Sequence, residues 1–137
     1  MICIPLYYIH KNNIVHRDLK PLNILSKYIG ELEIFFITDF GTSKNTENNN
    51  NKSTVNTLKT LPYASCEQFQ DKPAHSSFDI WSLGISLYFL MARKLPYIGV
   101  DDHEVNMAIW SKPRDKLSDN YSQTLRDLVD FCLNRDP

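Results

Sequence analysis

The sequence lacks any excess of basic residues. Its 137 residues include 15 Lys and Arg against 16 Asp and Glu, which gives a net charge of −1 and a pI of about 6.4. Attraction to nucleic acid or to an anionic membrane depends on clustered positive charge. We therefore expect neither nucleic acid nor a membrane among the partners of this protein.

Cysteine is also scarce, and the three cysteines, Cys3, Cys66 and Cys132, lie far apart. No CxxC pair occurs, and no His and Cys residues have the spacing of a zinc site. An odd and scattered set of cysteines indicates ordinary reduced thiols. We predict an intracellular protein, with the cytoplasm as its expected compartment.

Long hydrophobic runs are missing as well. The longest apolar stretch, residues 80–92, is interrupted by Ser82, Gly84 and Ser86 and is too short to cross a bilayer. Residues 1–9 are apolar but lack the basic segment and the small-residue cleavage site of a signal peptide. Apolar residues still make up 42% of the chain, which is sufficient for one domain with a sizeable core.

The most informative stretch that is present is HRDLKPLN, residues 16–23, which Asp39-Phe40-Gly41 follows. The two segments supply the carboxylates of Asp18 and Asp39 and the side-chain amide of Asn23. Phosphoryl transfer needs a carboxylate at the attacking hydroxyl and oxygen atoms that hold Mg²⁺ on the phosphates. The residue types in these segments are the right ones for that chemistry.

A β-hairpin is expected around this pair of segments. Residues 23–25 and 34–38 have the composition of short strands, with a loop around Gly30 between them. Such a hairpin would place Asn23 and Asp39 at neighbouring strand ends. Both side chains would then face one metal site.

Hydrophobic periodicity predicts four helices in the rest of the chain. Residues 79–93 are apolar on nearly every side, which is typical of a buried helix. The segment 45–56 is polar and rich in asparagine, so we predict a mobile loop there. Of the other three predicted helices, one ends near residues 12–13, one spans 101–110 and one spans 122–133.

Five segments, in their order along the chain, resemble the motifs of eukaryotic protein kinases of the serine/threonine type: 14–23, 39–41, 60–67, 79–84 and 133–137. The resemblance covers nearly all of residues 1–137. It implies the C-terminal lobe of a protein-kinase-like fold, mainly α-helical, with a small β-hairpin by the catalytic loop. The catalytic loop would span 14–25, the metal-binding turn and activation segment 39–67, and the central helix 79–93.

The resemblance also implies catalytic roles for particular residues. Asp18 would accept or orient the proton of the substrate hydroxyl, and Lys20 would spread the charge of the transferred phosphate. Thr60 would hydrogen-bond both side chains. Since serine/threonine kinases carry lysine two places after the aspartate, Lys20 favours a protein substrate with a Ser or Thr acceptor.

The implied cofactors are ATP and Mg²⁺. Asn23 and Asp39 would hold Mg²⁺ through oxygen atoms, Lys20 would contact the transferred phosphate, and Leu25 would pack beneath the adenine.

Further roles implied by the resemblance concern the loop itself. Asp79 would accept backbone N–H groups of the catalytic loop, and His16 would be a packed structural residue rather than a general base. Arg17 would pair with a phosphate on the activation loop, for which Thr54 and Thr57 are candidate sites.

The chain also departs from the kinase pattern. It has no glycine-rich loop, no lysine on an upstream strand and no partner glutamate on an upstream helix, so the small lobe is expected to be absent, as is the last helix. Glu67 lacks its usual arginine partner, and Cys66, Ser65 and Lys59 replace the family's proline, alanine and glycine. We therefore predict that the isolated chain binds ATP poorly and turns over negligibly.

Two alternatives to a catalytic fragment stay open. One is a non-catalytic, pseudokinase-like binding module that docks a partner on the exposed face of its cleft. The other is a truncated gene product with no independent role.

Overall fold

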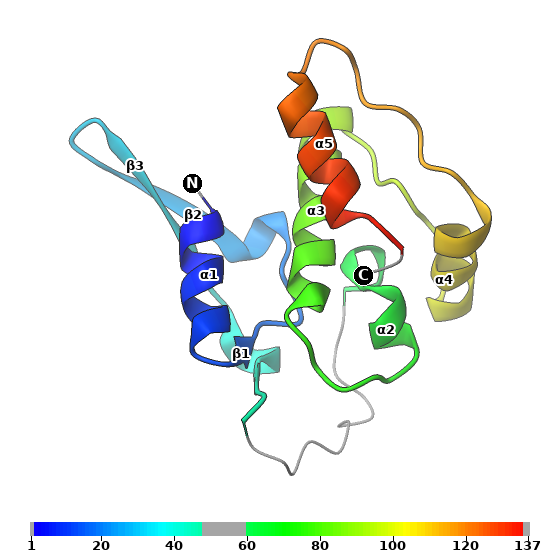
Figure 1. Ribbon diagram of the computed structural model, residues 1–137, viewed down its shortest axis with the longest axis horizontal. Helices are drawn as coiled ribbons and strands as arrows, with labels where there is room; N and C mark the ends of the chain where they lie inside the picture. The colour runs from blue at the N-terminus through cyan, green and yellow to red at the C-terminus, as the bar shows by residue number, and fades with distance from the viewer. Residues whose placement is uncertain (1, 48–59, 136–137) are drawn as a thin grey trace.

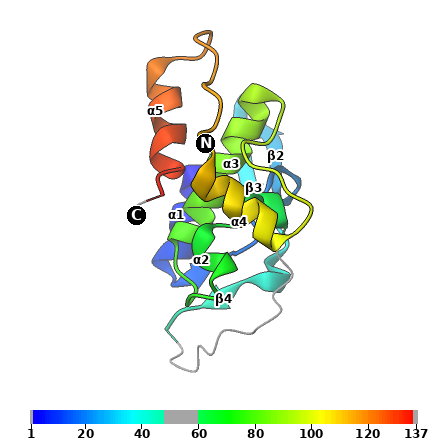
Figure 2. The same ribbon diagram turned by 90° about the vertical axis from the view of Figure 1, so that its right-hand side faces the viewer.

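The computed structural model describes residues 2–47 and 60–135. Helix α3 (Ser77–Ala92) lies at the centre of the molecule, with α5 (Gln123–Cys132) packed along it (Figure 1). Helix α1 (Cys3–Lys11) and a β-hairpin lie on one side of α3, and α4 (Asp102–Ser111) lies on the other. Figure 2 shows the same arrangement with α4 toward the viewer. The part of the chain that the structure describes has no helix with the length and apolar character needed to cross a membrane.

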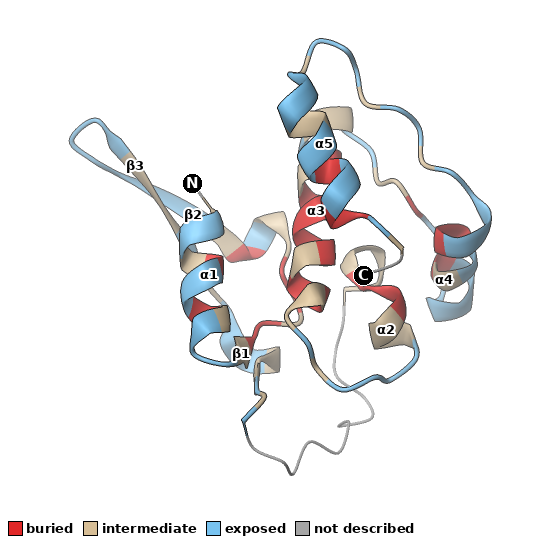
Figure 3. Cartoon of the chain, in the orientation of Figure 1, coloured by how far each residue is buried: buried red, intermediate tan, exposed pale blue. Residues whose placement is uncertain are grey.

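Most of α3 is buried (Figure 3), and its nearly uniform apolar character is explained by packing in two separate clusters. Trp81, Ile85 and Tyr88 pack into a cluster with α4 and α5. Leu83 instead joins Leu6 of α1 and other residues in a second cluster. A helix buried on two sides cannot show one polar face and one apolar face. The prediction of a buried helix over 79–93 is therefore confirmed, with its end at Ala92.

Close packing between α3 and α5 depends on Gly84. A Cβ atom built at this position would lie 2.7 Å from Cys132 Cβ and 2.9 Å from Leu133 Cδ2. These distances are shorter than van der Waals contact, so any side chain at residue 84 would push the two helices apart.

Replacing Gly84 with alanine is expected to lower the free energy of unfolding by about 1–3 kcal/mol, because the added methyl group overpacks the contact. Denaturant titration of the two proteins measures the change. Helix propensity alone predicts the opposite sign, a gain of about 1 kcal/mol. A more stable Gly84→Ala protein would therefore contradict the close packing of α3 on α5.

The predicted hairpin is present but longer than expected. Strand β2 (Ile24–Ile29) pairs antiparallel with β3 (Leu32–Ile37), and Ile29 is paired with Leu32. Gly30 has a φ of 62°, which suits a two-residue turn. The sequence prediction ended the first strand at residue 25 because apolar residues occur on both faces of this hairpin, and the alternation that marks a strand is lost.

A second ladder of two strands was not predicted. Strand β1 (Ile14–Val15) pairs antiparallel with β4 (Lys44–Asn45), and the N–H of Thr46 donates to the Asn13 carbonyl at 2.8 Å. The fold is therefore helical with two small antiparallel sheets. The predicted mobile loop over 45–56 begins inside β4, and its residues 48–56 lie outside the described part of the chain.

The other predicted helices are confirmed to within two residues. Pro5 lies in the first turn of α1, as expected. The side chains of Asp101 and Ser122 cap α4 and α5 by accepting N–H groups from the first turns. Four short helical elements were not predicted: η1 (Pro21–Asn23), η2 (Phe40–Thr42), η3 (Leu61–Tyr63) and α2 (Cys66–Phe69).

Candidate active site

The loop that precedes the β2–β3 hairpin is held in place by Asp79 of α3. Both oxygens of the fully buried Asp79 accept backbone N–H groups, Oδ2 from His16 and Oδ1 from Arg17, each at 2.8 Å. Arg17 has a φ of 69°, a left-handed conformation that is unfavourable for a residue with a Cβ atom. The two hydrogen bonds from consecutive amides fix this conformation, as the sequence predicted for Asp79.

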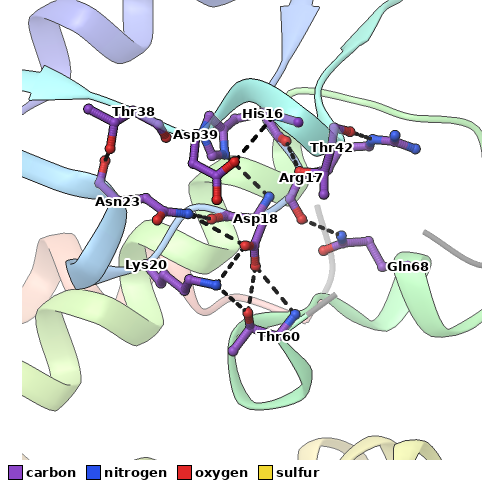
Figure 4. A network of polar contacts seen from close by, with 11 residues as sticks. His16, Arg17, Asp18, Lys20, Asn23, Thr38, Asp39, Thr42, Thr60 and Gln68 are labelled. Atoms are coloured by element: carbon purple, nitrogen blue, oxygen red, sulfur yellow. Dashed lines mark hydrogen bonds and ion pairs between the residues drawn. The ribbon is translucent and has the colours of Figure 1, made fainter. Parts of the chain in front are cut away.

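The next residue, Asp18, lies at the centre of a compact polar cluster (Figure 4). Lys20 Nζ donates to Asp18 Oδ2 at 2.7 Å and to Thr60 Oγ1 at 2.7 Å. The Thr60 hydroxyl in turn donates to Asp18 Oδ1 at 2.7 Å. These three side chains form a closed ring of hydrogen bonds, which contains the contacts predicted for Thr60.

The Asp18 carboxyl is ionised at neutral pH. Its burial favours the neutral form, but hydrogen bonds from Lys20 and Thr60 and the charge of Lys20 outweigh this effect and lower the pKa of Asp18 below its usual value. A charged carboxylate can accept a proton, which the neutral acid cannot do. Asp18 is thus in the state that a proton acceptor requires.

His16 is committed to structural contacts. The side chain is fully buried, its Nδ1 accepts the Asp18 N–H at 3.3 Å, and its Nε2 lies 2.9 Å from the Thr38 carbonyl. Because Nδ1 is an acceptor, Nε2 is assigned the hydrogen and donates it to Thr38. The ring also packs edge-on against Phe40, with 5.0 Å between centroids. With both nitrogens occupied, the prediction of a packed structural histidine is confirmed.

Asn23 and Asp39 lie at the same end of the hairpin, next to the pair that Ile24 of β2 forms with Ile37 of β3. The Asn23 side-chain amide donates to the Asp18 carbonyl at 2.9 Å, and Thr38 N donates to the Asn23 carbonyl at 2.9 Å. Asp39 follows directly, in the left-handed conformation with a φ of 63°. Figure 4 shows both side chains on the same side of Asp18.

The side-chain oxygen atoms of Asn23 and Asp39 are suitable ligands for Mg²⁺. Asn23 Nδ2 donates to Asp18, which leaves Oδ1 as the atom of this amide that could bind a cation, and the carboxylate of Asp39 is exposed. Carboxylate and amide oxygens are the ligands that Mg²⁺ prefers, usually one or two of them beside water and phosphate. Within residues 2–47 and 60–135, no group of three His, Cys, Asp or Glu side chains offers a competing all-protein metal site.

Comparison with known proteins agrees with this geometry. The model of the family described as "Protein kinase domain" matches residues 1–137. The chain belongs to the protein kinase family. The matched range contains all the segments that resemble kinase motifs.

The similar relatives of the kinase chain are longer than the chain itself. It is 37% identical to the serine/threonine-protein kinase Nek8 of Danio rerio, over 99% of the chain and 19% of Nek8. It is 35% identical to the serine/threonine-protein kinase nekl-2 of Caenorhabditis elegans, over 96% of the chain and 36% of nekl-2. With 3-phosphoinositide-dependent protein kinase B of Dictyostelium discoideum, the identity is 33% over 99% of the chain and 15% of that kinase. The chain spans well under half the length of each of these relatives.

The structure brings the predicted catalytic residues of the kinase chain together. Asp18, Lys20 and Thr60 touch one another, and Asn23 contacts the backbone and the carboxylate of Asp18. Leu25 lies on β2 with its side chain half exposed. Its predicted place beneath the adenine stays a prediction.

The guanidinium of Arg17 is partly engaged. Its Nε donates to the Thr42 carbonyl at 2.6 Å, and the Thr42 hydroxyl donates to the His16 carbonyl at 3.0 Å. The proposed phosphosites Thr54 and Thr57 lie outside the described residues. The phosphate-binding role of Arg17 therefore remains a prediction.

Two contacts of the site were missed by sequence reasoning. His10 shows no partner spacing in the sequence, yet its Nε2 lies 2.8 Å from Asp79 Oδ2. Gln68 on α2 donates from Nε2 to the Arg17 carbonyl at 3.0 Å. The partners in each pair are more than fifty residues apart along the chain, so no local spacing reveals them.

The cysteines of the kinase chain are unpaired, as predicted. Burial and the neighbouring charge of Glu67 raise the pKa of Cys66 to about 11. Because the thiolate is the reactive form, Cys66 is inert at neutral pH.

Proposed function

We propose that the chain is the catalytic, C-terminal lobe of a serine/threonine protein kinase that transfers the γ-phosphoryl group of ATP to protein hydroxyls. The observation that carries this proposal is the ring of hydrogen bonds among Asp18, Lys20 and Thr60. The ring holds a charged carboxylate and an ammonium group side by side at one place. The names of the relatives as serine/threonine kinases and the presence of Lys20 support Ser and Thr acceptors over Tyr.

Each of these residues has a defined task in the proposed reaction. The Asp18 carboxylate accepts the proton of the substrate hydroxyl as the hydroxyl oxygen bonds to the γ-phosphorus of ATP, and the bond from that phosphorus to the bridging oxygen of the β-phosphate breaks to release ADP. The Lys20 ammonium stabilises the negative charge on the transferring phosphoryl group, while Thr60 keeps both side chains oriented. Asn23 and Asp39 would hold Mg²⁺, which neutralises charge on the phosphates of ATP.

The lobe by itself is incomplete as a kinase. Catalysis in this family also requires a Gly-rich loop and a Lys–Glu ion pair, and the 137 residues supply neither. We therefore expect the isolated chain to bind ATP poorly and to turn over negligibly. Activity is expected when the remaining parts are supplied.

The experiment compares the isolated chain with a chimera in which the chain replaces its matched segment of 136 residues in Danio rerio Nek8. Both are assayed with radiolabelled ATP and peptides that carry Ser, Thr or Tyr as the acceptor. The chimera is expected to phosphorylate the Ser and Thr peptides only, and the isolated chain none of them. A folded chimera without activity, or one that prefers Tyr, would contradict the proposal.

A second candidate function is a non-catalytic binding module, and the outer face of the hairpin favours it. Leu25, Ile29, Leu32 and Phe36 lie on one face of the β2–β3 ladder, and their side chains are 44% to 65% exposed. Contiguous exposed apolar surface of this kind often binds a partner. A folded, monomeric chain that captures no partner in pull-down experiments would argue against this function.

A further inference from the structure

The conformation of Arg17 is controlled by contacts on both of its peptide groups. Its N–H donates to Asp79 on α3, and its carbonyl accepts from Gln68 Nε2 on α2. That carbonyl belongs to the same peptide plane as the N–H of Asp18. Any rotation of this plane changes the backbone of Asp18 directly and moves its carboxylate.

Gln68 is itself held in one orientation. Its Oε1 accepts the backbone N–H of Ser65 at 3.0 Å, at the start of α2. The side-chain oxygen is thereby assigned to Ser65, so the NH₂ group must face the Arg17 carbonyl. The side chain thus acts as a rigid bridge between the first turn of α2 and the catalytic loop.

The segment from Thr60 to Gln68 therefore contacts Asp18 and the residue before it, Arg17. At its beginning, Thr60 bonds the carboxylate of Asp18, and at its end Gln68 bonds the preceding peptide group. Figure 4 shows the two contacts on adjacent sides of Asp18. A left-handed conformation is unfavourable for a non-glycine residue such as Arg17 and persists only where surrounding contacts hold it.

We propose that Gln68 is a positioning residue, which fixes the Arg17–Asp18 peptide plane and so the direction of the Asp18 carboxylate. This inference rests on the proposed kinase function for its catalytic meaning. A catalytic group must be held within a fraction of an ångström of its productive position, so even a small rotation of this plane lowers the rate.

The test uses two substitutions that separate the donor role of the Gln68 side chain from its acceptor role. Gln68→Glu keeps an oxygen for the Ser65 N–H but replaces the donor to Arg17 with an acceptor. Gln68→Met keeps the length of the side chain and removes both hydrogen bonds. The matched control is Gln70→Glu, which makes the same change of charge at an exposed residue next to α2.

The readout is amide hydrogen exchange measured by NMR without nucleotide, with the N–H of fully buried Ile85 as an internal standard. In Gln68→Glu and Gln68→Met, the Asp18 N–H is expected to exchange at least about ten-fold faster relative to Ile85, as for a local opening. Gln70→Glu is expected to leave the ratio unchanged. If both amides accelerate equally, Gln68 is only structural and the proposal is overturned.

If Gln68→Glu does not fold, Gln68→Met decides the question. A wild-type chain in which Asp18 N–H exchanges as fast as an exposed loop amide also overturns the proposal, whether or not either variant folds. Since no ATP is required, the result is independent of the phosphorylation assay. Failure of the kinase proposal would appear in the phosphorylation assay, whereas failure of the Gln68 proposal would appear in the hydrogen-exchange ratio.

Discussion

Replacing Asp18 with asparagine in the Nek8 chimera is expected to lower kcat by about 10²–10⁴-fold, the usual contribution of a positioned general base. The amide has nearly the same shape and keeps one acceptor oxygen, which can serve one of the two donors, Lys20 or Thr60. What it loses is the negative charge that accepts the proton. Initial rates at saturating ATP and peptide measure the effect.

The matched control for this substitution is Asp71→Asn. Asp71 is exposed and has a φ of 51°, a conformation that asparagine adopts as readily as aspartate. Its rate is expected to equal that of the unmodified chimera. If Asp18→Asn kept most of the activity, Asp18 would not be the general base of the reaction. The ring of hydrogen bonds would then have only a structural role.

The largest effect on stability is expected from Asp79→Ala, with a loss of about 3–5 kcal/mol in the free energy of unfolding. The substitution leaves two buried N–H groups, those of His16 and Arg17, without an acceptor. It also removes the carboxylate partner of His10. Since small proteins are stable by only about 5–15 kcal/mol, this loss is a large part of the total.

Urea titration followed by circular dichroism gives the change in the free energy of unfolding. Asp127→Ala serves as the control, because Asp127 is an exposed acidic residue on α5 and its removal is expected to cost little. Asp79→Asn should fall between the two, since it keeps one acceptor oxygen. A loss below about 1 kcal/mol for Asp79→Ala would mean that other contacts hold the loop.

The parts of the site that sequence reasoning found are those encoded locally. Asp18, Asn23 and Asp39 stand in short motifs at fixed spacing, and the all-round apolar pattern of residues 79–93 marks a buried helix without reference to its neighbours. The chemistry of phosphoryl transfer restricts which residue types can occupy such motifs.

The parts that were missed depend on residues brought together only by folding. His10 and Asp79 are 69 positions apart, and Arg17 and Gln68 are 51 apart, so neither pair leaves a periodic signal. The length of the hairpin was underestimated for a different reason. The tip residues Tyr28, Ile29 and Leu32 are all exposed and apolar, so the usual alternation between the two faces is absent.

The polar cluster around Asp18 contains chain segments that are far from one another in the sequence, since Asp18 and Thr60 are 42 positions apart. Contacts of high sequence separation carry a large loop-closure entropy and form late in folding. Partly folded forms of this chain can therefore contain helices and the hairpin without a usable carboxylate. The hydrogen-bonded cluster around Asp18 should form only in the last cooperative step of folding. The fraction of natively folded molecules therefore limits any activity that is measured.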